Sequence, residues 1–282
     1  MIYLVLAILT STLIIVTFRL FERFKVSILQ AITVNYFVAA AFGYLSQAGN
    51  FSFSAIPSQT WFLSALVIGV TLIVSFNLFA LSARHSGVSV TAISSRMSVI
   101  IPITLGFLIF NDTAGWAKIT GIVVAMIAFY FTSKKGKTLL VNTKHAFLPV
   151  MLFFAVGIND SMMKVAEHYF INGDFVVFLA TAFGVALILG SVVMFAAHKK
   201  EKFALRNILA GIILGLLNWF STLYFLKGLD LFQVSFFVPV YNVGVVALSS
   251  LAGFLFFHEK PTTHKLIGLG LAIVAIVLIA NG

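Results

Sequence analysis

The chain has 282 residues, of which 61% are hydrophobic and only 9% are charged. Because soluble domains carry roughly a quarter charged residues, this composition excludes a water-soluble globule. The formal net charge of +10 does not indicate nucleic-acid binding, since the basic residues lie in short clusters between apolar runs, as in the loops of membrane proteins.

Apolar runs of about 20 residues, the length that crosses a bilayer core as a helix, recur along the whole chain. In lipid, backbone hydrogen bonds must be satisfied within each segment, so we interpret these runs as helices and not as strands. No signal peptide is expected, because Met1 leads directly into the first run. The expected fold is an all-α integral membrane protein with ten transmembrane helices, at residues 2–18, 28–45, 61–81, 88–110, 116–132, 146–163, 175–197, 207–226, 231–257 and 264–280.

The sequence repeats itself at an offset of about 147 residues, because residues 253–280 follow the pattern of residues 106–131. The matched positions pair Gly106 with Gly253, Asp112 with Glu259, Lys118 with Lys265 and Gly121 with Gly268. Two further blocks keep nearly the same offset, residues 19–24 with 164–169 and residues 79–90 with 225–236. The sequence therefore predicts two five-helix repeats, residues 1–133 and 146–282, joined by a basic loop at 134–145.

The odd number of helices in each repeat means that the second copy enters the membrane from the opposite side. Of the 18 basic residues, 14 lie in the connections after the odd-numbered helices: Arg19, Arg23, Lys25, Arg84, Lys134, Lys135, Lys137, Lys144, Lys199, Lys200, Lys202, Arg206, Lys260 and Lys265. Lys118, Lys164 and Lys227 lie on the other side, and Arg96 lies within the fourth span. The positive-inside rule places the larger set in the cytoplasm and both termini outside. Such an inverted-topology repeat recurs in secondary transporters, although some channels share it.

Ten helices in two halves, each ending in an apolar helix, a turn with an acid and a glycine-bearing apolar helix, resemble the EamA-type permeases of the drug/metabolite transporter superfamily. Residues 239–268 carry the resemblance most closely, and residues 106–121 are a weaker copy. The family turn usually has Gly-Glu, where this chain has His258-Glu259 and Asn111-Asp112. The resemblance implies a multi-pass protein of the cell (cytoplasmic) membrane that moves a small metabolite by alternating access. It also implies a central cavity lined by helices 1, 3, 4, 6, 8 and 9, and it leaves the substrate open.

Arg96 is a charge inside the predicted fourth span, and a charge at membrane depth is costly enough to be a functional hypothesis by default. An offset of 146 carries Arg96 onto Asn242, so the pseudo-symmetry predicts that the two side chains face each other across the cavity, with Ser95 nearby. A guanidinium stays protonated and offers a bidentate fork to a carboxylate, which favours a solute such as an amino acid. The alternative is a structural ion pair or a side chain that reaches to the interface.

Asp160, in the predicted sixth span, has three alternative roles: pairing with Arg96, binding a proton, or pairing with Lys164 one helical turn later. A coupling proton is therefore left open. The first span holds no carboxylate, which argues against the cation antiport of the small multidrug transporters. Further candidates for contact with solute are Asn77, Asn218, Trp219 and Tyr241. Amide and aromatic side chains suit small polar solutes, but they also join helices to one another.

The sequence contains no HExxH motif, no nucleophile elbow and no phosphate-binding glycine loop. Its histidines fall at connections without metal-ligand spacing, and it has no cysteine. We therefore expect no catalytic residue, no cofactor, no metal and no nucleic-acid partner, and the oligomeric state is left open. Pro102 and Pro239 predict kinks within the fourth and ninth spans. The expected function is secondary transport of a small solute through the bilayer. The alternative is a membrane-embedded enzyme or a lipid-handling protein.

Overall fold

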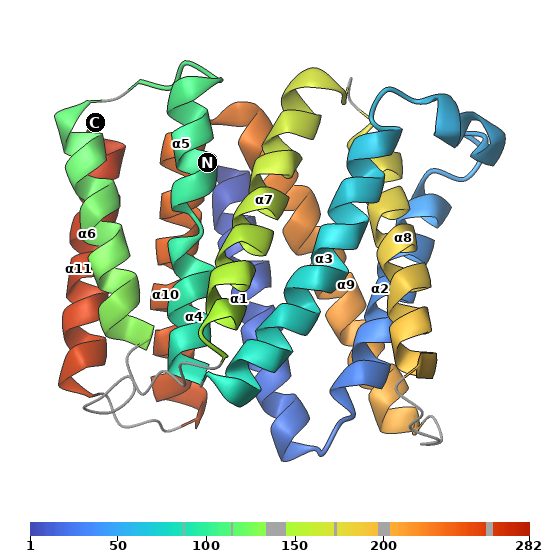
Figure 1. Ribbon diagram of the computed structural model, residues 1–282, viewed down its shortest axis with the longest axis horizontal. Coiled ribbons are helices and arrows are strands. Elements are labelled where there is room, and N and C mark those ends of the chain that lie inside the picture. The colour runs from blue at the N-terminus through green and yellow to red at the C-terminus, as the bar shows by residue number, and fades with distance from the viewer. Residues whose placement is uncertain (87, 114, 134–144, 172–173, 197–203, 258–261) are drawn as a thin grey trace. The chain divides into compact units, whose positions relative to one another are not determined.

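The computed structural model describes residues 1–86, 88–113, 115–133, 145–171, 174–196, 204–257 and 262–282, and these residues are almost entirely helical (Figure 1). The helices are α1 (Ile2–Arg23), α2 (Ile28–Ser46), η1 (Phe53–Ser58, a 3-10 helix), α3 (Phe62–His85), α4 (Val88–Met97), α5 (Ile100–Leu108), α6 (Trp116–Ser133), α7 (Phe147–Tyr169), α8 (Phe175–Ala196), α9 (Leu205–Leu231), α10 (Val234–Phe257) and α11 (Thr263–Ala280).

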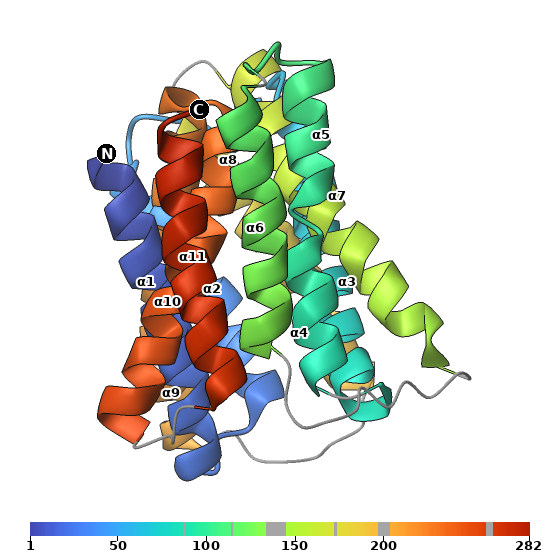
Figure 2. The ribbon, with the colours of Figure 1, turned by 90° about the vertical axis from the view of Figure 1, so that its left-hand side faces the viewer.

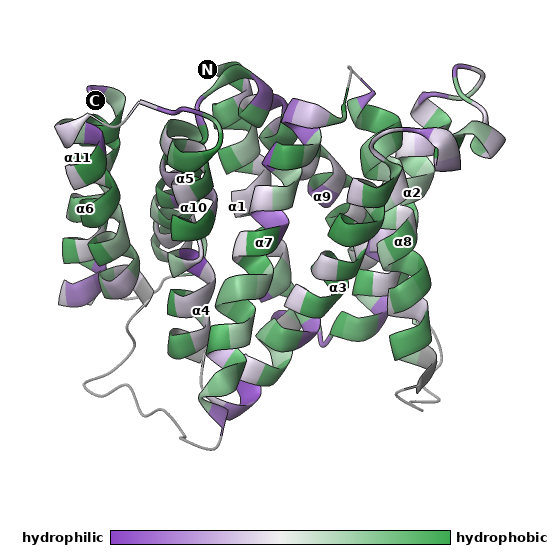
Figure 3. Cartoon of the chain, turned by 45° about the horizontal axis from the view of Figure 1, so that its top comes forward, coloured by the Kyte–Doolittle hydropathy of each residue, from purple (hydrophilic) through white to green (hydrophobic). Residues whose placement is uncertain are grey.

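The helices have the length and apolar character of membrane spans, and hydrophobic residues predominate along them (Figure 3). Within the described ranges, 9 segments are long and apolar enough to cross a bilayer. The shorter apolar helix Trp116–Thr132 supplies a tenth. The prediction of an all-α membrane protein with ten spans is therefore confirmed.

The fourth span was predicted as one continuous helix, and this is wrong. It consists of two helices, α4 (Val88–Met97) and α5 (Ile100–Leu108), which together make one crossing of 19 residues, Val90–Leu108. Pro102 has no N–H, and its ring crowds the carbonyl group of Ser98, four residues earlier. The Ser98 carbonyl accepts instead from the N–H of Ile101 at 3.0 Å, and the Arg96 carbonyl accepts from the N–H of Val99 at 3.4 Å. The predicted kink at Pro102 is therefore a break in the helix.

Other boundaries shift because charged residues near a span belong to the helix and not to the loop. Helix α1 continues past its predicted end at residue 18 to Arg23, so that basic side chains lie in its last turns, where a helix favours cations. Helix α9 includes Lys227 and ends at Leu231, where the predicted ninth span begins. The Lys227 ammonium lies 5.3 Å from the centre of the Tyr3 ring on α1. This cation–π contact stabilises the positive charge of Lys227.

The chain folds into two compact units, and each unit combines segments from both halves of the sequence. Unit 1 comprises Met1–Ile73 and Val165–Asp230, and unit 2 comprises Val74–Lys164 and Leu231–Gly282. Helices α3 and α7 contribute to both units. The compact units therefore do not coincide with the predicted repeats, residues 1–133 and 146–282. The division of the chain into these two repeats stays a prediction.

In unit 1, two glycine contacts between helices fall at positions that the predicted repeat pairs. A Cβ atom placed on Gly69 of α3 would lie 2.6 Å from the Cβ of Val185 on α8. A Cβ atom placed on Gly215 of α9 would lie 2.8 Å from the Cβ of Val38 on α2. The offset relates the two contacts, since 69 + 146 = 215 and 38 + 147 = 185. Both approaches depend on the missing side chain, as in many helix pairs in membranes.

Unit 2 shows the same reciprocity where α6 packs along α11, and Figures 1 and 2 both show these helices side by side. A Cβ atom on Gly121 would lie 2.7 Å from Cγ1 of Ile279, and one on Gly268 would lie 2.5 Å from Cγ2 of Thr132. The offset again relates the contacts, since 121 + 147 = 268 and 132 + 147 = 279. Because the start of each helix meets the end of the other, the pair is antiparallel, as an inverted repeat is expected to produce.

Candidate functional site

Arg96 and Asn242, the two polar residues that the repeat makes equivalent, are in direct contact in unit 2. The Arg96 Nη1 donates to Oδ1 of Asn242 at 2.8 Å. The Asn242 Nδ2 donates to the Val238 carbonyl oxygen of its own helix at 3.0 Å, which turns the amide oxygen toward Arg96. The Asn242 side chain is 8% exposed, and Arg96 is half-buried. The predicted juxtaposition of the two side chains is present, and contact with a solute stays a prediction.

The break between α4 and α5 gives Arg96 a favourable electrostatic position. Arg96 lies in the last turn of α4, where the final carbonyl groups carry a partial negative charge that stabilises cations. The Ser98 Oγ donates to the Ser95 carbonyl oxygen at 2.7 Å, so Ser95 takes part in the break through its backbone. The guanidinium is thus held where the transmembrane helix is interrupted.

Helix α7 brings a carboxyl group to the same region of unit 2. A Cβ atom on Gly157 would lie 2.9 Å from the Cβ of Ile101, so the missing side chain lets α7 approach the start of α5. Asp160 follows Gly157 by three residues and therefore lies on the same face of α7. Its carboxyl group interacts electrostatically with the Arg96 guanidinium and accepts a hydrogen bond from Asn159. The two charges therefore lie near enough to interact, and the three alternatives for Asp160 stay predictions.

Tyr241 completes a group of polar side chains around Arg96. Its ring stacks on Phe237 with the ring centres 6.1 Å apart, and its phenol lies within electrostatic range of the Arg96 guanidinium. We call Arg96, Asn242, Asp160 and Tyr241 the Arg96 cluster. The cluster offers guanidinium, amide and phenol donors together with a carboxyl acceptor, which suits hydrogen bonding to a polar solute. Asn77, also predicted for this site, is half-buried on the part of α3 that belongs to the same unit.

Two of the predicted site residues, Asn218 and Trp219, belong to unit 1. The Asn218 Nδ2 donates to Oδ1 of Asn35 at 3.1 Å and so joins α9 to α2. The Trp219 indole is 2% exposed and packs against Phe42 and Phe183, with ring centres 6.1 Å away in each case. In this structure both side chains hold unit 1 together, and their contact with solute stays a prediction.

The acid turn of the first half has a structural role that the sequence did not reveal. The Asp112 Oδ2 accepts from the N–H of Ser235 at 2.7 Å, in the first turn of α10, where backbone N–H groups lack partners within the helix. Lys118 is 4% exposed, and its Nζ donates to Oε1 of Gln233 and Oγ1 of Thr113, both at 2.8 Å. The acid after the apolar run was the available signal, but its target lies 123 residues away.

The Arg96 cluster contains one carboxyl group and no histidine. Within the described residues, no group of three or more histidine, aspartate or glutamate side chains could hold a metal ion. The one carboxyl group of the cluster faces a guanidinium, and a fixed cation beside a carboxylate disfavours a second cation. The arrangement can therefore hold a polar solute by hydrogen bonds and charge.

Comparison with known proteins places these features in context. Residues 144–281 match the EamA-like transporter family. An uncharacterized protein of Haemophilus influenzae is 27% identical over 97% of this chain and 95% of its own length. A Lactococcus lactis protein named "Putative sugar uptake protein YxfA" is 25% identical over 79% of each chain, and a Bacillus cereus protein named "Putative sugar uptake protein" is 27% identical over 68% of this chain and 67% of its own. A solved crystal structure has the same fold, with a TM-score of 0.82 and 12% identity over 98% of this chain and 94% of the other.

Proposed function

We propose that this chain, which belongs to the EamA-like transporter family through residues 144–281, is a secondary transporter whose Arg96 cluster binds a small polar solute. The family and the relatives named for uptake identify a membrane transporter of small solutes and point away from an enzyme. The role of the cluster, the class of solute and the mechanism are the proposal.

The observation that carries the proposal is a cation held at the end of a broken transmembrane helix. A charge at the centre of a span costs about 2.5–3.5 kcal/mol on membrane-insertion scales. Such a charge is therefore a functional-site hypothesis by default. Interrupted helices supply binding sites in several secondary transporters, because helix ends present unpaired backbone groups and partial charges. Arg96 lies at such an end and donates to Asn242 on α10, its counterpart in the repeat.

The balance of charge in the cluster favours an uncharged, hydroxylated solute. The positive charge of Arg96 faces the carboxyl group of Asp160, so the pair offers both donors and acceptors without a large net charge. A hydroxyl group can accept from the guanidinium and donate to the carboxylate at the same time. The names of the Lactococcus and Bacillus relatives support a sugar as the solute.

A solute with a carboxylate, such as an amino acid, is the second candidate, and the guanidinium favours it. One arm of the Arg96 fork donates to Asn242, and the other N–H groups of the planar guanidinium remain suited to a carboxylate. We further propose that transport proceeds by alternating access, because the predicted repeat inverts its charge bias between copies. Asp160 is the residue of the cluster that could carry a coupling proton.

Uptake into proteoliposomes containing the purified chain tests the proposal. Labelled D-glucose and labelled glutamate represent the two classes of solute, and the cation tetraphenylphosphonium serves as a substrate that the site should reject. We expect Arg96→Ala to lower uptake about a hundredfold, because hydrogen bonds to a charged group contribute roughly 1.5–3 kcal/mol. The matched control is Arg84→Ala, which removes an exposed arginine from the last turn of α3 in the same unit.

Replacing Asp160 with asparagine separates the two classes of solute. The change leaves the cationic charge of Arg96 without its counter-charge, so uptake of glutamate should rise relative to uptake of D-glucose. Full uptake of every tested solute by a folded Arg96→Ala variant would remove Arg96 from the binding site. Uptake of tetraphenylphosphonium well above its entry into protein-free liposomes would exclude both classes.

A further inference from the structure

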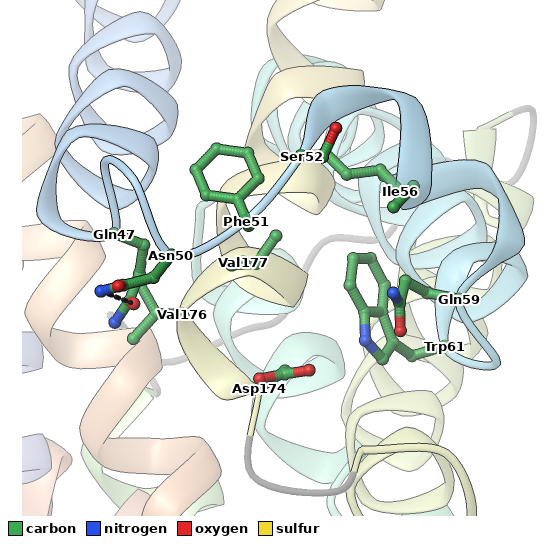
Figure 4. Close-up of a pocket in the computed structure, with 11 residues that line it drawn as sticks. Gln47, Asn50, Phe51, Ser52, Ile56, Gln59, Trp61, Asp174, Val176 and Val177 are labelled. Atoms are coloured by element: carbon green, nitrogen blue, oxygen red, sulfur yellow. Dashed lines mark hydrogen bonds between the residues drawn. The ribbon is translucent and has the colours of Figure 1, made fainter.

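Unit 1 contains a polar pocket whose lining includes no residue of the Arg96 cluster (Figure 4). It is enclosed by the turn after α2, by η1, by the residues leading into α3 and by the start of α8. Its volume is about 270 Å³. Sites for small molecules occupy roughly 300–1,000 Å³, so this pocket, which lies just below that range, suits only a small solute.

Trp61 gives the pocket a buried hydrogen-bond donor that no described residue satisfies. The side chain is 2% exposed, and its ring packs edge to face against Phe178 with the ring centres 5.9 Å apart. The indole Nε1 has no hydrogen-bond partner among the described residues. An unsatisfied buried donor is unfavourable, so a ligand that supplies an acceptor gains from this position.

Asp174 gives the pocket an acceptor with a negative charge. It immediately precedes α8, its side chain is exposed, and Figure 4 shows its carboxylate and the Trp61 indole facing the same space. Among the described residues, the pocket lining contains no lysine or arginine, so an anionic solute would be repelled by the Asp174 carboxylate. A hydroxyl group has no such conflict, since it can donate to the carboxylate.

Amide side chains surround these two groups. Gln47 and Asn50 lie on one side of the pocket and Gln59 lies beside Trp61 on the other (Figure 4). The Asn50 Nδ2 donates to Oε1 of Gln47 at 3.4 Å, and each amide keeps both donor and acceptor capacity for a ligand. Phe51 adds an aromatic wall, which suits the apolar faces of a ring-shaped solute.

We propose that this pocket binds a small, uncharged, polyhydroxylated solute. One hydroxyl oxygen accepts from the Trp61 N–H, a second hydroxyl group donates to the Asp174 carboxylate, and the amides bind the others. Residue 50 lies on the predicted outer side of the membrane, so the pocket receives solute before uptake. Binding here is independent of the Arg96 cluster, although the two sites favour the same class of solute.

Binding to the full chain purified in detergent tests this proposal, with Arg96→Ala as the background so that the Arg96 cluster contributes little. Calorimetric titration with D-glucose, D-ribose, myo-inositol and glycerol covers uncharged polyols, and glutamate and tetramethylammonium represent an anion and a cation. We expect at least one polyol to bind. Asp174→Asn should weaken it severalfold, because a charge-assisted hydrogen bond becomes a neutral one, and Trp61→Phe should weaken it about tenfold, because one hydrogen bond is lost. The matched controls are Asp230→Asn and Trp116→Phe, which change an exposed acid and an exposed tryptophan outside the pocket and should leave binding unchanged.

The proposal is overturned if no polyol in the panel binds, if tetramethylammonium or glutamate binds in preference, or if Asp174→Asn leaves the affinity unchanged. If Trp61→Phe fails to fold, the variants Asn50→Ala and Gln59→Ala, at exposed residues of the pocket, take its place. Each should then weaken the binding of the polyol. The outcome is distinct from that of the transport experiment. Loss of uptake in Arg96→Ala with polyol binding retained supports both sites, whereas retained uptake with Asp174-dependent binding supports only this pocket.

Discussion

Two crossings of unit 2 that the repeat makes counterparts, α4–α5 and α10, respond differently to an internal proline. Helix α10 runs without interruption over 24 residues although it contains Pro239. The crossing made by α4 and α5 is broken four residues before Pro102. Pro239 lies in the second turn of its helix, close to an end that Asp112 already stabilises, whereas Pro102 lies near the middle of its crossing. Both crossings contain a proline, and only the crossing with the proline away from its ends is broken.

The difference explains why the charge lies on one member of the pair. The broken crossing presents carbonyl groups at the end of α4, which favour the guanidinium of Arg96. In α10 the backbone carbonyl groups around Asn242 are used within a continuous helix, and the Val238 carbonyl accepts a second hydrogen bond from the Asn242 amide. A neutral amide suits that position. The two residues that the predicted repeat pairs thus differ in charge within one cluster.

Moving the break to α10 is the strongest test of this comparison. Leu248 is the counterpart of Pro102, since 102 + 146 = 248, and Leu248→Pro places a proline near the middle of α10. We expect a loss of about 3 kcal/mol or more in the free energy of unfolding, measured by denaturant titration in mixed micelles. Leu248→Ala is the matched control and should cost less. Equal stability of the two variants would show that α10 tolerates a break as readily as α4–α5.

Exchanging the two polar residues tests whether the helix end matters for the charge. Arg96→Asn alone should lower uptake about a hundredfold, because the charged donor is lost. The double variant with Arg96→Asn and Asn242→Arg keeps one guanidinium and one amide in the pair, but places the cation on the continuous helix. We expect it to recover less than a tenth of the uptake of the unaltered chain, measured in proteoliposomes. Full recovery would show that the pair alone, without the break, is sufficient.

The sequence predicts those features that depend on one helix or on the offset between copies. The ten spans follow from apolar length, because in lipid each segment must satisfy its own backbone. The contact of Arg96 with Asn242 follows from the repeat, which pairs residues 146 positions apart. The break at Ser98 does not follow, because Pro102 indicates a lost hydrogen bond without showing whether neighbouring groups restore the helix.

Features built from several distant segments could not be predicted. The pocket at Trp61 combines four segments of unit 1, and none of them carries a recognisable motif alone. The packing of Trp219 among other rings could not be predicted either, and its contact with solute stays a prediction. Composition distinguishes apolar from polar residues, but it does not show which aromatic side chains face a solute and which fill the core.

A smaller effect tests how the start of α10 is held. A Cβ atom on Gly106 would lie 2.6 Å from Oδ2 of Asp112, the atom that accepts from the N–H of Ser235. Gly106→Ala should therefore displace the carboxylate and lose the same hydrogen bond that Asp112→Ala removes, at a cost of about 1 kcal/mol. Against this cost, alanine within a helix gains about 0.5–1 kcal/mol over glycine, so Gly106→Ala alone should be close to neutral. In the Asp112→Ala background no bond remains to be lost, and the same change should be stabilising.

The expected coupling between the two sites is about 1 kcal/mol, read from a double-mutant cycle of unfolding free energies in mixed micelles. Gly270→Ala, where a Cβ atom meets nothing within 4 Å, is the control and should have the same effect in both backgrounds. Simple additivity of Gly106→Ala and Asp112→Ala would show that Gly106 does not act through the carboxylate.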